Sequence, residues 1–345
     1  MKFKQLICEL SQLEGISGFE YSFSHRIAEM LGEFCQEVYT DPLGSVHGIL
    51  VCGKPDAKKV LLDAHMDEIG LMVSKISDEG FLHVVNIGGV DSRILPGTCV
   101  TVHGKERLPG TVAIRPPHIQ TAAEMKQAME LSDLVVDIGY GPKKTKELVS
   151  VGDMITFDVK PAQLLGGRIA GKTLDDRAGV ATLISAGKKL AKHQLSVDVE
   201  LLISAQEETG LRGAETGGYR SRADMAIAVD VSHGKTPDAS GDNVYTFGGG
   251  AMIGMGPNMD KHITRDLIRL AKEKELPHQV EVMGGGTGTN AWALQVLRSG
   301  IPCGLLSIPL RYMHTPCECI DLKDAKAVRD LMVAFVKLQS GRAEV

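Results

Sequence analysis

The amino-acid sequence predicts an α/β fold in which a mostly parallel sheet, with helices on both faces, is interrupted by a small β-rich insertion. Two patterns lead to this prediction. Strand-like and helix-like segments alternate near both ends of the 345-residue chain, which is typical of parallel strands joined by helical crossovers. From Gly70 to about Val159, short β-branched runs alternate with turn residues instead, which is typical of a small antiparallel barrel or sandwich.

The N-terminal segment begins with an amphipathic helix. Leu6, Leu10 and Leu13 lie at i, i+4 and i+7 and therefore share one helix face, and Gly15 and Gly18 end the pattern. The elements expected next are a second helix over residues 22–34 and a short buried strand over residues 60–64.

The insertion is predicted from its strands and turns. Asp78-Glu79-Gly80 and Leu108-Pro109-Gly110 have the composition of tight turns. The strands are expected over residues 71–76, 81–87, 99–103, 111–114, 134–138 and 154–159, with one helix over residues 121–131.

After Gly166-Gly167 the alternation of strands and helices returns. Strands are expected over residues 199–205, 225–229 and 303–308, and helices over residues 178–190, 264–274 and 322–338. The length suggests about two domains. The order of the segments indicates that the β-rich domain is inserted within the sequence of the α/β domain. We predict a catalytic domain formed by residues 1–67 and 165–345, interrupted by a β-rich domain over residues 68–164.

Composition excludes several classes of function. Hydrophobic residues make up 43% and charged residues 23% of the chain, a balance typical of globular proteins. The net charge of −5 and the lack of a basic block argue against binding nucleic acid or an anionic membrane. No apolar stretch is long enough to span a membrane, and the N-terminus lacks the pattern of a signal peptide. The seven scattered cysteines suit a reducing compartment, so we expect a cytoplasmic protein.

Charged and imidazole side chains gather where the predicted strands end. Because ligand sites in open α/β sheets lie beyond the carboxyl ends of the strands, we expect these residues to converge. They are His65 and Asp67, the pair Asp175-Asp176, the pair Glu207-Glu208, Asp230, and His314.

Such a cluster predicts a metal site. Several carboxylates in a partly dehydrated crevice need cations among them, and imidazole nitrogens with carboxylate oxygens suit Zn²⁺, with Co²⁺ or Mn²⁺ as alternatives. Glu207 and Glu208 are neighbours in an extended segment and point in opposite directions, so one can bind metal while the other acts as general base. Asp67 shares a face with His65 and can orient its ring.

Five motifs together resemble the TET-type metallo-aminopeptidases, a clan MH family that includes glutamyl aminopeptidase and proteins once labelled cellulase M. The resemblance covers essentially the whole chain and includes Ser17-Gly18-Phe19-Glu20. The motifs are His65-Met66-Asp67-Glu68, Leu174-Asp175-Asp176-Arg177, Ala205-Gln206-Glu207-Glu208-Thr209-Gly210, Val229-Asp230, and Pro309-Leu310-Arg311-Tyr312-Met313-His314-Thr315.

The resemblance implies a zinc-exopeptidase-like catalytic fold and a specific set of roles. Glu207 would be the general base beside a hydroxide that bridges two metal ions, with Asp67 as a further catalytic residue. In relatives the first Asp of the pair bridges the metals, so Asp175 is favoured over Asp176. The implied ligand sets are His65, Asp175 and Asp230 for one metal, and Asp175, Glu208 and His314 for the other.

The resemblance also implies an assembly. The insertion would be a PDZ-like barrel that drives dimerisation, and the dimers would form a hollow tetrahedral dodecamer that admits peptide substrates. The chain departs from the family at one position: Asn290 stands in a Thr-Asn-Ala run where the family more often has Thr-Asp-Ala.

Two other functions compete with the aminopeptidase interpretation. A metal-independent glycoside hydrolase of the endoglucanase type would use two carboxylates about 5–9 Å apart, but here the carboxylates are mixed with histidines. A non-catalytic assembly or peptide-binding protein would have no need for the complete ligand set. The sequence does not choose among acidic, basic and apolar N-terminal residues in the substrate.

Overall fold

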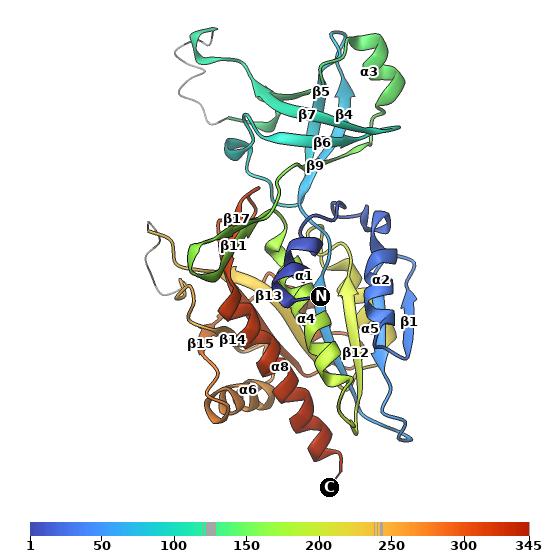
Figure 1. Cartoon of the computed structure of the whole chain (residues 1–345), viewed down its shortest axis with the longest axis vertical. Coiled ribbons are helices and arrows are strands. Elements are labelled where there is room, and N and C mark those ends of the chain that lie inside the picture. Colours follow the sequence, from blue (N-terminus) through green and yellow to red (C-terminus); the bar gives the residue numbers. More distant parts are fainter. Residues whose placement is uncertain (120, 122–128, 238, 240, 242–243, 345) are drawn as a thin grey trace.

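The protein consists of a small β-barrel seated on a larger α/β unit (Figure 1). A computed structural model describes residues 1–345 apart from residues 120, 122–128, 238, 240, 242–243 and 345. Both parts of the predicted fold are therefore present: helices and strands alternate in the lower unit, and antiparallel strands form the upper one. No helix within the described residues has the length and apolar character needed to cross a membrane.

The α/β unit is built on an 11-stranded sheet with a parallel centre. The central strands β12, β3, β13 and β16 are parallel to one another. The pairings of β1 with β2, β2 with β12, β16 with β17, β17 with β11, β11 with β10 and β16 with β14 are antiparallel, whereas β14 and β15 are parallel. The order is β1 (Glu37–Thr40), β2 (Val46–Leu50), β12 (Asp198–Ser204), β3 (Lys59–His65), β13 (Met225–His233), β16 (Cys303–Arg311), β17 (Glu318–Asp321), β11 (Arg168–Gly171) and β10 (Ala162–Leu164), with β14 (Ala251–Met255) beside β16 and β15 (His278–Val282) beside β14.

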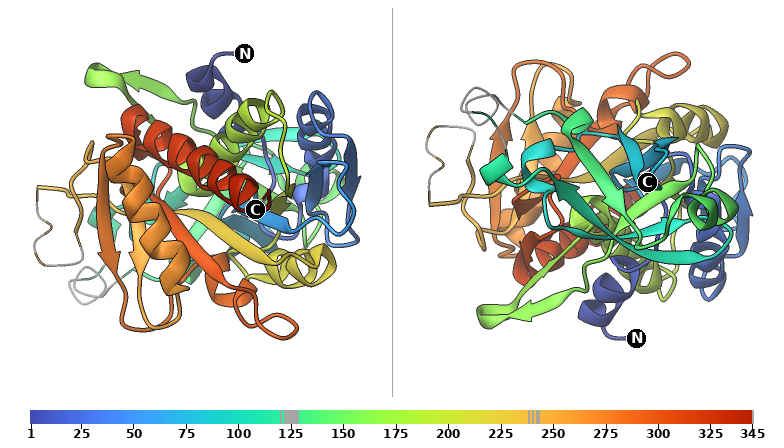
Figure 2. Two further views of the ribbon diagram at one scale, coloured as in Figure 1. Left: turned by 90° about the horizontal axis from the view of Figure 1, so that it is seen from below. Right: turned by 90° about the horizontal axis from the view of Figure 1, so that it is seen from above.

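Helices cover both faces of this sheet, as predicted (Figure 2). The strand residues alternate between the two faces: Leu62 of β3 packs into the main core, whereas Leu61 packs into a smaller core on the opposite face. The main core takes residues from α1 (Phe3–Leu10), α2 (Ser24–Gly32), α4 (Leu174–Leu190), α6 (Lys261–Glu273) and α8 (Leu322–Arg342), and the smaller core from α5 (Arg212–Ser221) and α7 (Asn290–Leu294).

The β-rich part is a closed barrel with its own apolar core. Its strands follow the order β4 (Gly70–Ile76), β5 (Leu82–Ile87), β8 (Leu134–Asp137), β7 (Arg107–Ile114), β6 (Cys99–His103) and β9 (Met154–Phe157), and α3 (Pro142–Leu148) lies outside them. A barrel rather than a sandwich is thus the outcome. All six strands lie within the predicted insertion 68–164, although the division into two domains stays a prediction.

One predicted turn is wrong, and one predicted helix lies mostly outside the described residues. Leu108-Pro109-Gly110 belongs to β7 instead of a turn, and the chain turns at residues 104–106. Pro109 pairs with Thr101 of β6, while the pairing of β7 with β8 covers only residues 111–114, so its missing N–H falls where β7 has one partner strand. The helix predicted over residues 121–131 coincides with residues 122–128, which are not described.

Candidate active site

The carboxyl ends of the parallel strands meet on the side of the sheet that faces the barrel (Figure 1). His65 is the last residue of β3, and its neighbour Ser204 ends β12, which leads directly to Glu207 and Glu208. Asp230 lies within β13, and His314 follows β16. Asp175 lies in the first turn of α4. The structure therefore brings these predicted site residues together at one edge.

Asp175 lies at the centre of this cluster. Its Oδ1 is 3.1 Å from Nε2 of His65, and its Oδ2 is 3.4 Å from Nε2 of His314. The neighbouring Asp176 has a different environment, because its Oδ1 accepts a hydrogen bond of 3.1 Å from the backbone N–H of Gly179 inside α4. The peptide bond between Asp175 and Asp176 is cis. Of the two aspartates, Asp175 faces both imidazoles.

The donor atoms form groups that could hold metal ions. His65, Asp175 and Asp230 each offer one ligand atom within 4.8 Å of the others, and so do Asp175, Glu208 and His314. These two groups are the ligand sets implied by the family resemblance. A third group with the same spacing combines His65 with Glu207 and Glu208. Imidazole nitrogens and carboxylate oxygens are the donors that Zn²⁺, Co²⁺ and Mn²⁺ accept, so the residues present fit such ions.

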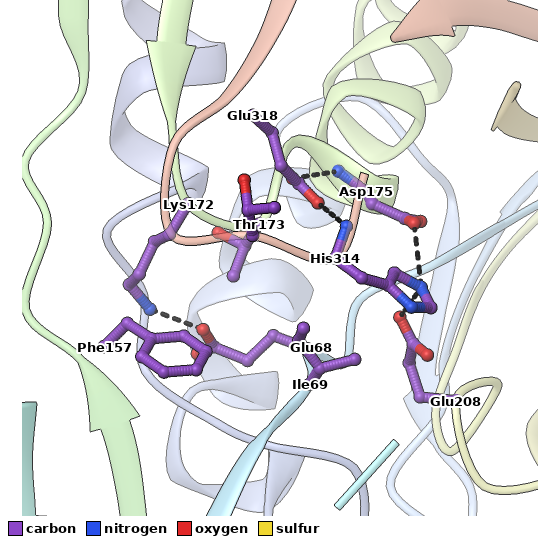
Figure 3. Close-up of a pocket in the computed structure, with 10 residues that line it drawn as sticks. Glu68, Ile69, Phe157, Lys172, Thr173, Asp175, Glu208, His314 and Glu318 are labelled. Carbon is purple, nitrogen blue, oxygen red and sulfur yellow. Dashed lines mark hydrogen bonds and ion pairs between the residues drawn. The ribbon is translucent and has the colours of Figure 1, made fainter. Parts of the chain in front are cut away.

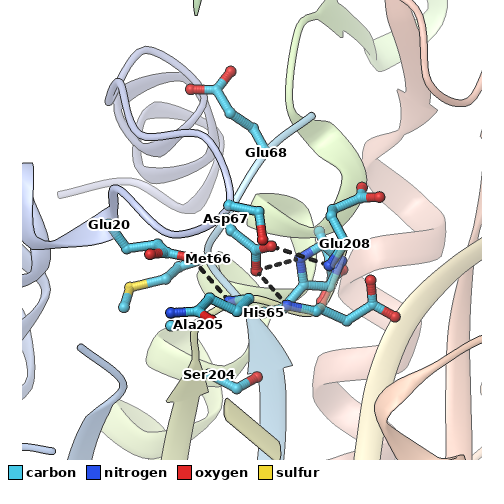
Figure 4. A network of polar contacts seen from close by, with 12 residues as sticks. Glu20, His65, Met66, Asp67, Glu68, Ser204, Ala205 and Glu208 are labelled. Carbon is cyan, nitrogen blue, oxygen red and sulfur yellow. Dashed lines mark hydrogen bonds and ion pairs between the residues drawn. The ribbon is translucent and has the colours of Figure 1, made fainter. Parts of the chain in front are cut away.

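Asp67, which follows β3, contacts the segment that follows β12 (Figure 4). Its Oδ1 lies 3.4 Å from Nδ1 of His65, as expected for a residue that orients the ring. Its carboxylate also accepts hydrogen bonds from the backbone N–H groups of Glu207 at 3.0 Å and Glu208 at 3.1 Å. Asp67 is fully buried. It therefore lies beside the ring of His65 and holds the backbone of Glu207 and Glu208 through hydrogen bonds.

The side chains of the site contain more carboxylate groups than cationic groups. Burial, together with neighbouring carboxylates, raises the pKa of Asp230 well above its ordinary value and that of Glu207 to about 8. Hydrogen bonds that the His314 ring donates to the carboxylates of Asp175 and Glu208 raise the pKa of His314 to about 11. Such opposed shifts mark a cluster with uncompensated negative charge, which bound cations would neutralise.

Two buried glutamates near the site were not predicted. Glu318 of β17 accepts hydrogen bonds from the backbone N–H groups of Asp175 at 3.0 Å and His314 at 2.9 Å (Figure 3). Glu20 accepts hydrogen bonds from the N–H groups of Gly18 at 3.0 Å and Gln206 at 2.8 Å. Burial, with the nearby Asp67 carboxylate, raises the pKa of Glu20 to about 7. Glu318 therefore holds the backbone of two predicted ligands, and Glu20 holds the residue before the predicted base Glu207.

Two buried cationic side chains, Lys172 and Arg177, contact Glu68 next to the site. Lys172 Nζ is 2.6 Å from Oε2 of Glu68, and the Arg177 guanidinium lies 3.4 Å from Oε1 of the same side chain. Arg177 also donates to the backbone carbonyls of Met66, Leu10, Leu13 and Gly15. The guanidinium therefore fixes the segment after α1 against the segment that follows β3, directly behind the site.

Asn290 lies below the site. It is buried at the start of α7, where its Nδ2 donates a hydrogen bond of 2.8 Å to Oγ of Ser204. Asp63 of β3 lies close to both side chains and is also fully buried. Burial raises the pKa of Asp63 to about 6, and Ser204 and Asn290 offset part of that rise. The departure from the family pattern thus concerns a neutral partner for a buried carboxyl group.

Asn290→Asp should lower the free energy of unfolding at pH 7 by about 1–3 kcal/mol, because it places a second carboxyl group in an apolar layer that already contains Asp63. Urea unfolding monitored by circular dichroism measures the effect. The double variant Asp63→Asn with Asn290→Asp keeps a single carboxyl group and should recover most of the loss. Equal stability of the single variant and the wild type would contradict the expectation.

An open pocket of about 480 Å³ leads to the cluster. Besides the polar residues above, its wall contains Leu211 and Met313, together with backbone and side chains of residues 231–233 and 287–289. Residues 231–233 are the end of β13, and the chain just beyond them is anchored by Arg311, which donates a hydrogen bond of 2.6 Å to the carbonyl of Lys235 and stacks on Phe247. The predicted ligands and Glu207 therefore lie on the wall of a pocket that is open to solvent.

Comparison with known proteins agrees with this arrangement. The family model for the M42 glutamyl aminopeptidases matches residues 44–331. Lysyl aminopeptidase from Pyrococcus furiosus is 33% identical over 343 residues, which cover 96% of each chain. A TET aminopeptidase from a marine sediment archaeon, Thaumarchaeota archaeon SCGC AB-539-E09, has a structure with a TM-score of 0.93 at 30% identity, and the match covers 99% of each chain.

Two further structures bear on assembly and on the competing function. The TET1 peptidase of Pyrococcus horikoshii, described as assembling into a tetrahedron or a large octahedral shell, has a TM-score of 0.85 at 30% identity and covers 97% of this chain and 99% of its own. A Thermotoga maritima protein described as an endoglucanase has a TM-score of 0.77 at 29% identity, and the match covers 96% of this chain and 98% of the other.

The fold and the polar cluster at its strand ends are those of a peptidase. The chain belongs to the M42 glutamyl aminopeptidase family, because the family model covers most of its length and a curated aminopeptidase matches it from end to end. The TET-type resemblance predicted from the motifs is therefore confirmed, and the protein is an aminopeptidase.

Proposed function

We propose that the protein is a metal-dependent aminopeptidase that removes the N-terminal residue of peptides at a site for two divalent ions. One observation carries this proposal: each carboxylate oxygen of Asp175 faces a different imidazole, that of His65 or that of His314. A further carboxylate stands beside each imidazole, Asp230 beside His65 and Glu208 beside His314. A carboxylate shared in this way is typical of sites that hold two ions about 3.5–4 Å apart.

The chain's own residues would provide proton transfer and the positioning of the catalytic groups. When bound, the two ions supply Lewis-acid chemistry, which polarises the scissile carbonyl and brings the pKa of water close to neutrality. The carboxyl group of Glu207 lines the pocket beside His65 and Glu208. It is placed to take a proton from the attacking water and pass it to the leaving amine. Asp67 positions Glu207 through its backbone N–H.

The substrate and the assembly follow from the same family. We propose peptide substrates with a free α-amino group, which the open pocket can admit at one end. We further propose that the barrel forms a dimer contact and that dimers assemble into a tetrahedral dodecamer in the cytoplasm, as a TET relative assembles into a tetrahedron. Zn²⁺ is the first choice of ion for this mixed nitrogen and oxygen ligand set, followed by Co²⁺ and Mn²⁺.

Metal removal tests the proposal directly. Dialysis against a chelator should abolish release of the N-terminal residue from a panel of aminoacyl reporter substrates, and returning Zn²⁺, Co²⁺ or Mn²⁺ should restore it. Metal analysis of the same samples should show two ions per chain in the active form. The panel also measures which N-terminal residues the pocket accepts.

Full peptidase activity in a sample with less than one ion per chain would contradict the proposal. The matched control is cellulose hydrolysis by the chelated protein. Because glycoside hydrolases use two carboxylates and no metal, cellulose hydrolysis that survives complete chelation would favour the endoglucanase function instead.

A further inference from the structure

The barrel contributes a backbone group to the site in the α/β unit. The loop after β5 contains Gly88 and Gly89, and the carbonyl oxygen of Gly89 lies 3.1 Å from Nδ1 of His314. His314 belongs to the segment after β16 in the sheet, 225 residues further along the chain. The contact therefore crosses from one unit of the protein to the other and ends on a proposed metal ligand.

This contact determines which nitrogen of His314 faces the site. A carbonyl oxygen only accepts hydrogen bonds, so Nδ1 must carry the proton that it donates to Gly89. When the ring is neutral, as it must be to bind a metal ion, its lone pair is then on Nε2, which faces Glu208 at 3.3 Å and Asp175 at 3.4 Å. A second hydrogen bond to a metal-binding imidazole is the usual means of fixing its tautomer and ring orientation.

The two proposed histidine ligands are oriented in different ways. His65 is only 2% exposed, and the carboxylate beside its Nδ1 belongs to Asp67, two residues along the same segment. His314 is 34% exposed, and its Nδ1 contact comes from the barrel. The backbone N–H of His314 is held separately by Glu318. The ring of His314 therefore depends on the position of the barrel, whereas the ring of His65 does not.

Both positions in the loop require glycine, for different reasons. A Cβ atom on Gly89 would lie 2.6 Å from Nδ1 of His314, which is inside van der Waals contact. Gly88 has a φ of 75°, and a Cβ there would lie 3.3 Å from Oε2 of Glu208. The loop thus approaches both His314 and Glu208 as closely as a backbone can.

We propose that Gly89 is a positioning residue of the active site, and that its carbonyl orients His314 for the metal position formed by Asp175, Glu208 and His314. This inference rests on the two-ion site of the proposed function. The affinity for the ion at this position would then depend on where the barrel lies relative to the α/β unit. The affinity at the position formed by His65, Asp175 and Asp230 would not depend on the barrel.

Gly89→Ala tests the proposal. The φ of Gly89 lies outside the left-handed range, so the alanine adds a methyl group without backbone strain, and the imidazole of His314 must move aside. The affinity for the ion at the His314 position should fall by about 10- to 100-fold, with the first ion bound as in the wild type. A Zn²⁺ titration in competition with a chromophoric chelator resolves the two affinities.

Gly141→Ala is the matched control, because this barrel glycine has a φ of −71° and open space where its Cβ would stand. It should keep both affinities. Crystal structures of the metal-free wild type and variants supply a second readout, in which the His314 ring should be displaced in Gly89→Ala alone.

An unmoved ring with two wild-type affinities would overturn the proposal, and so would an equal loss at both positions. If the wild type bound fewer than two ions while Gly89→Ala still displaced the ring, the two-ion function would be wrong and the orienting role of Gly89 would stand.

Discussion

Glu207→Gln should retain both metal ions and the wild-type fold while kcat falls by roughly 10²- to 10⁴-fold, the usual contribution of a general acid–base group. The amide keeps the shape of the side chain but cannot accept a proton. The backbone N–H of Glu207, which donates to Asp67, is unchanged by the substitution, so the arrangement around His65 should persist. Steady-state kinetics with an aminoacyl reporter, together with metal analysis, measure both quantities.

Glu215→Gln provides the control for that variant. Glu215 is an exposed residue of α5, so its replacement removes one negative charge near the site without touching the pocket wall. It should keep the wild-type kcat. Normal turnover in Glu207→Gln would show that another group moves the proton, and Glu208 would be the next residue to examine.

Asp175→Asn should empty both metal positions and reduce activity to background. The reason is that one carboxylate faces both imidazoles, and a neutral amide offers only one oxygen to the two positions. Loss of an outer hydrogen-bond partner alone costs about 10- to 100-fold in metal affinity, and loss of a shared ligand should exceed that. The number of bound ions per chain, measured after gel filtration, is the primary readout.

Asp176→Asn separates the two aspartates. Burial, with Asp230 nearby, raises the pKa of Asp176 well above its ordinary value, and its Oδ1 accepts a hydrogen bond from Gly179 that an asparagine oxygen can also accept. This variant should therefore keep two ions per chain. If Asp176→Asn lost the ions and Asp175→Asn kept them, the bridging role would belong to Asp176.

The residues of the site were predictable because topology gathers them. Parallel strands end at one edge, so His65, Glu208 and Asp230 had to lie near one another once their strands were recognised. The helices α4 and α8 were predictable from their length and apolar pattern. Short strands such as β10, at the edge of the sheet, and β17, between β16 and β11, carry too few residues for a clear period, and they were missed.

The supporting residues were not predictable from local sequence. Glu318 serves the site through hydrogen bonds to the backbone of Asp175, 143 residues away, and Gly89 through the ring of His314. No motif identifies such partners, because any carboxylate or carbonyl in the right place would serve. The error at Pro109 has a related cause: a proline is compatible with a strand where one neighbour is missing, and only the sheet shows where that is.

The closed barrel also has a consequence for the order in which the protein folds. Its first and last strands, β4 and β9, pair with each other, and its contacts lie within about ninety residues of continuous chain. We therefore expect the barrel to fold early during synthesis, before β12 and β16 have left the ribosome. Once closed, it holds the end of β3 near the start of β11 and shortens the loop that the central sheet must close. The inserted barrel would thus act as a scaffold for the α/β unit, whose two segments precede and follow it along the chain.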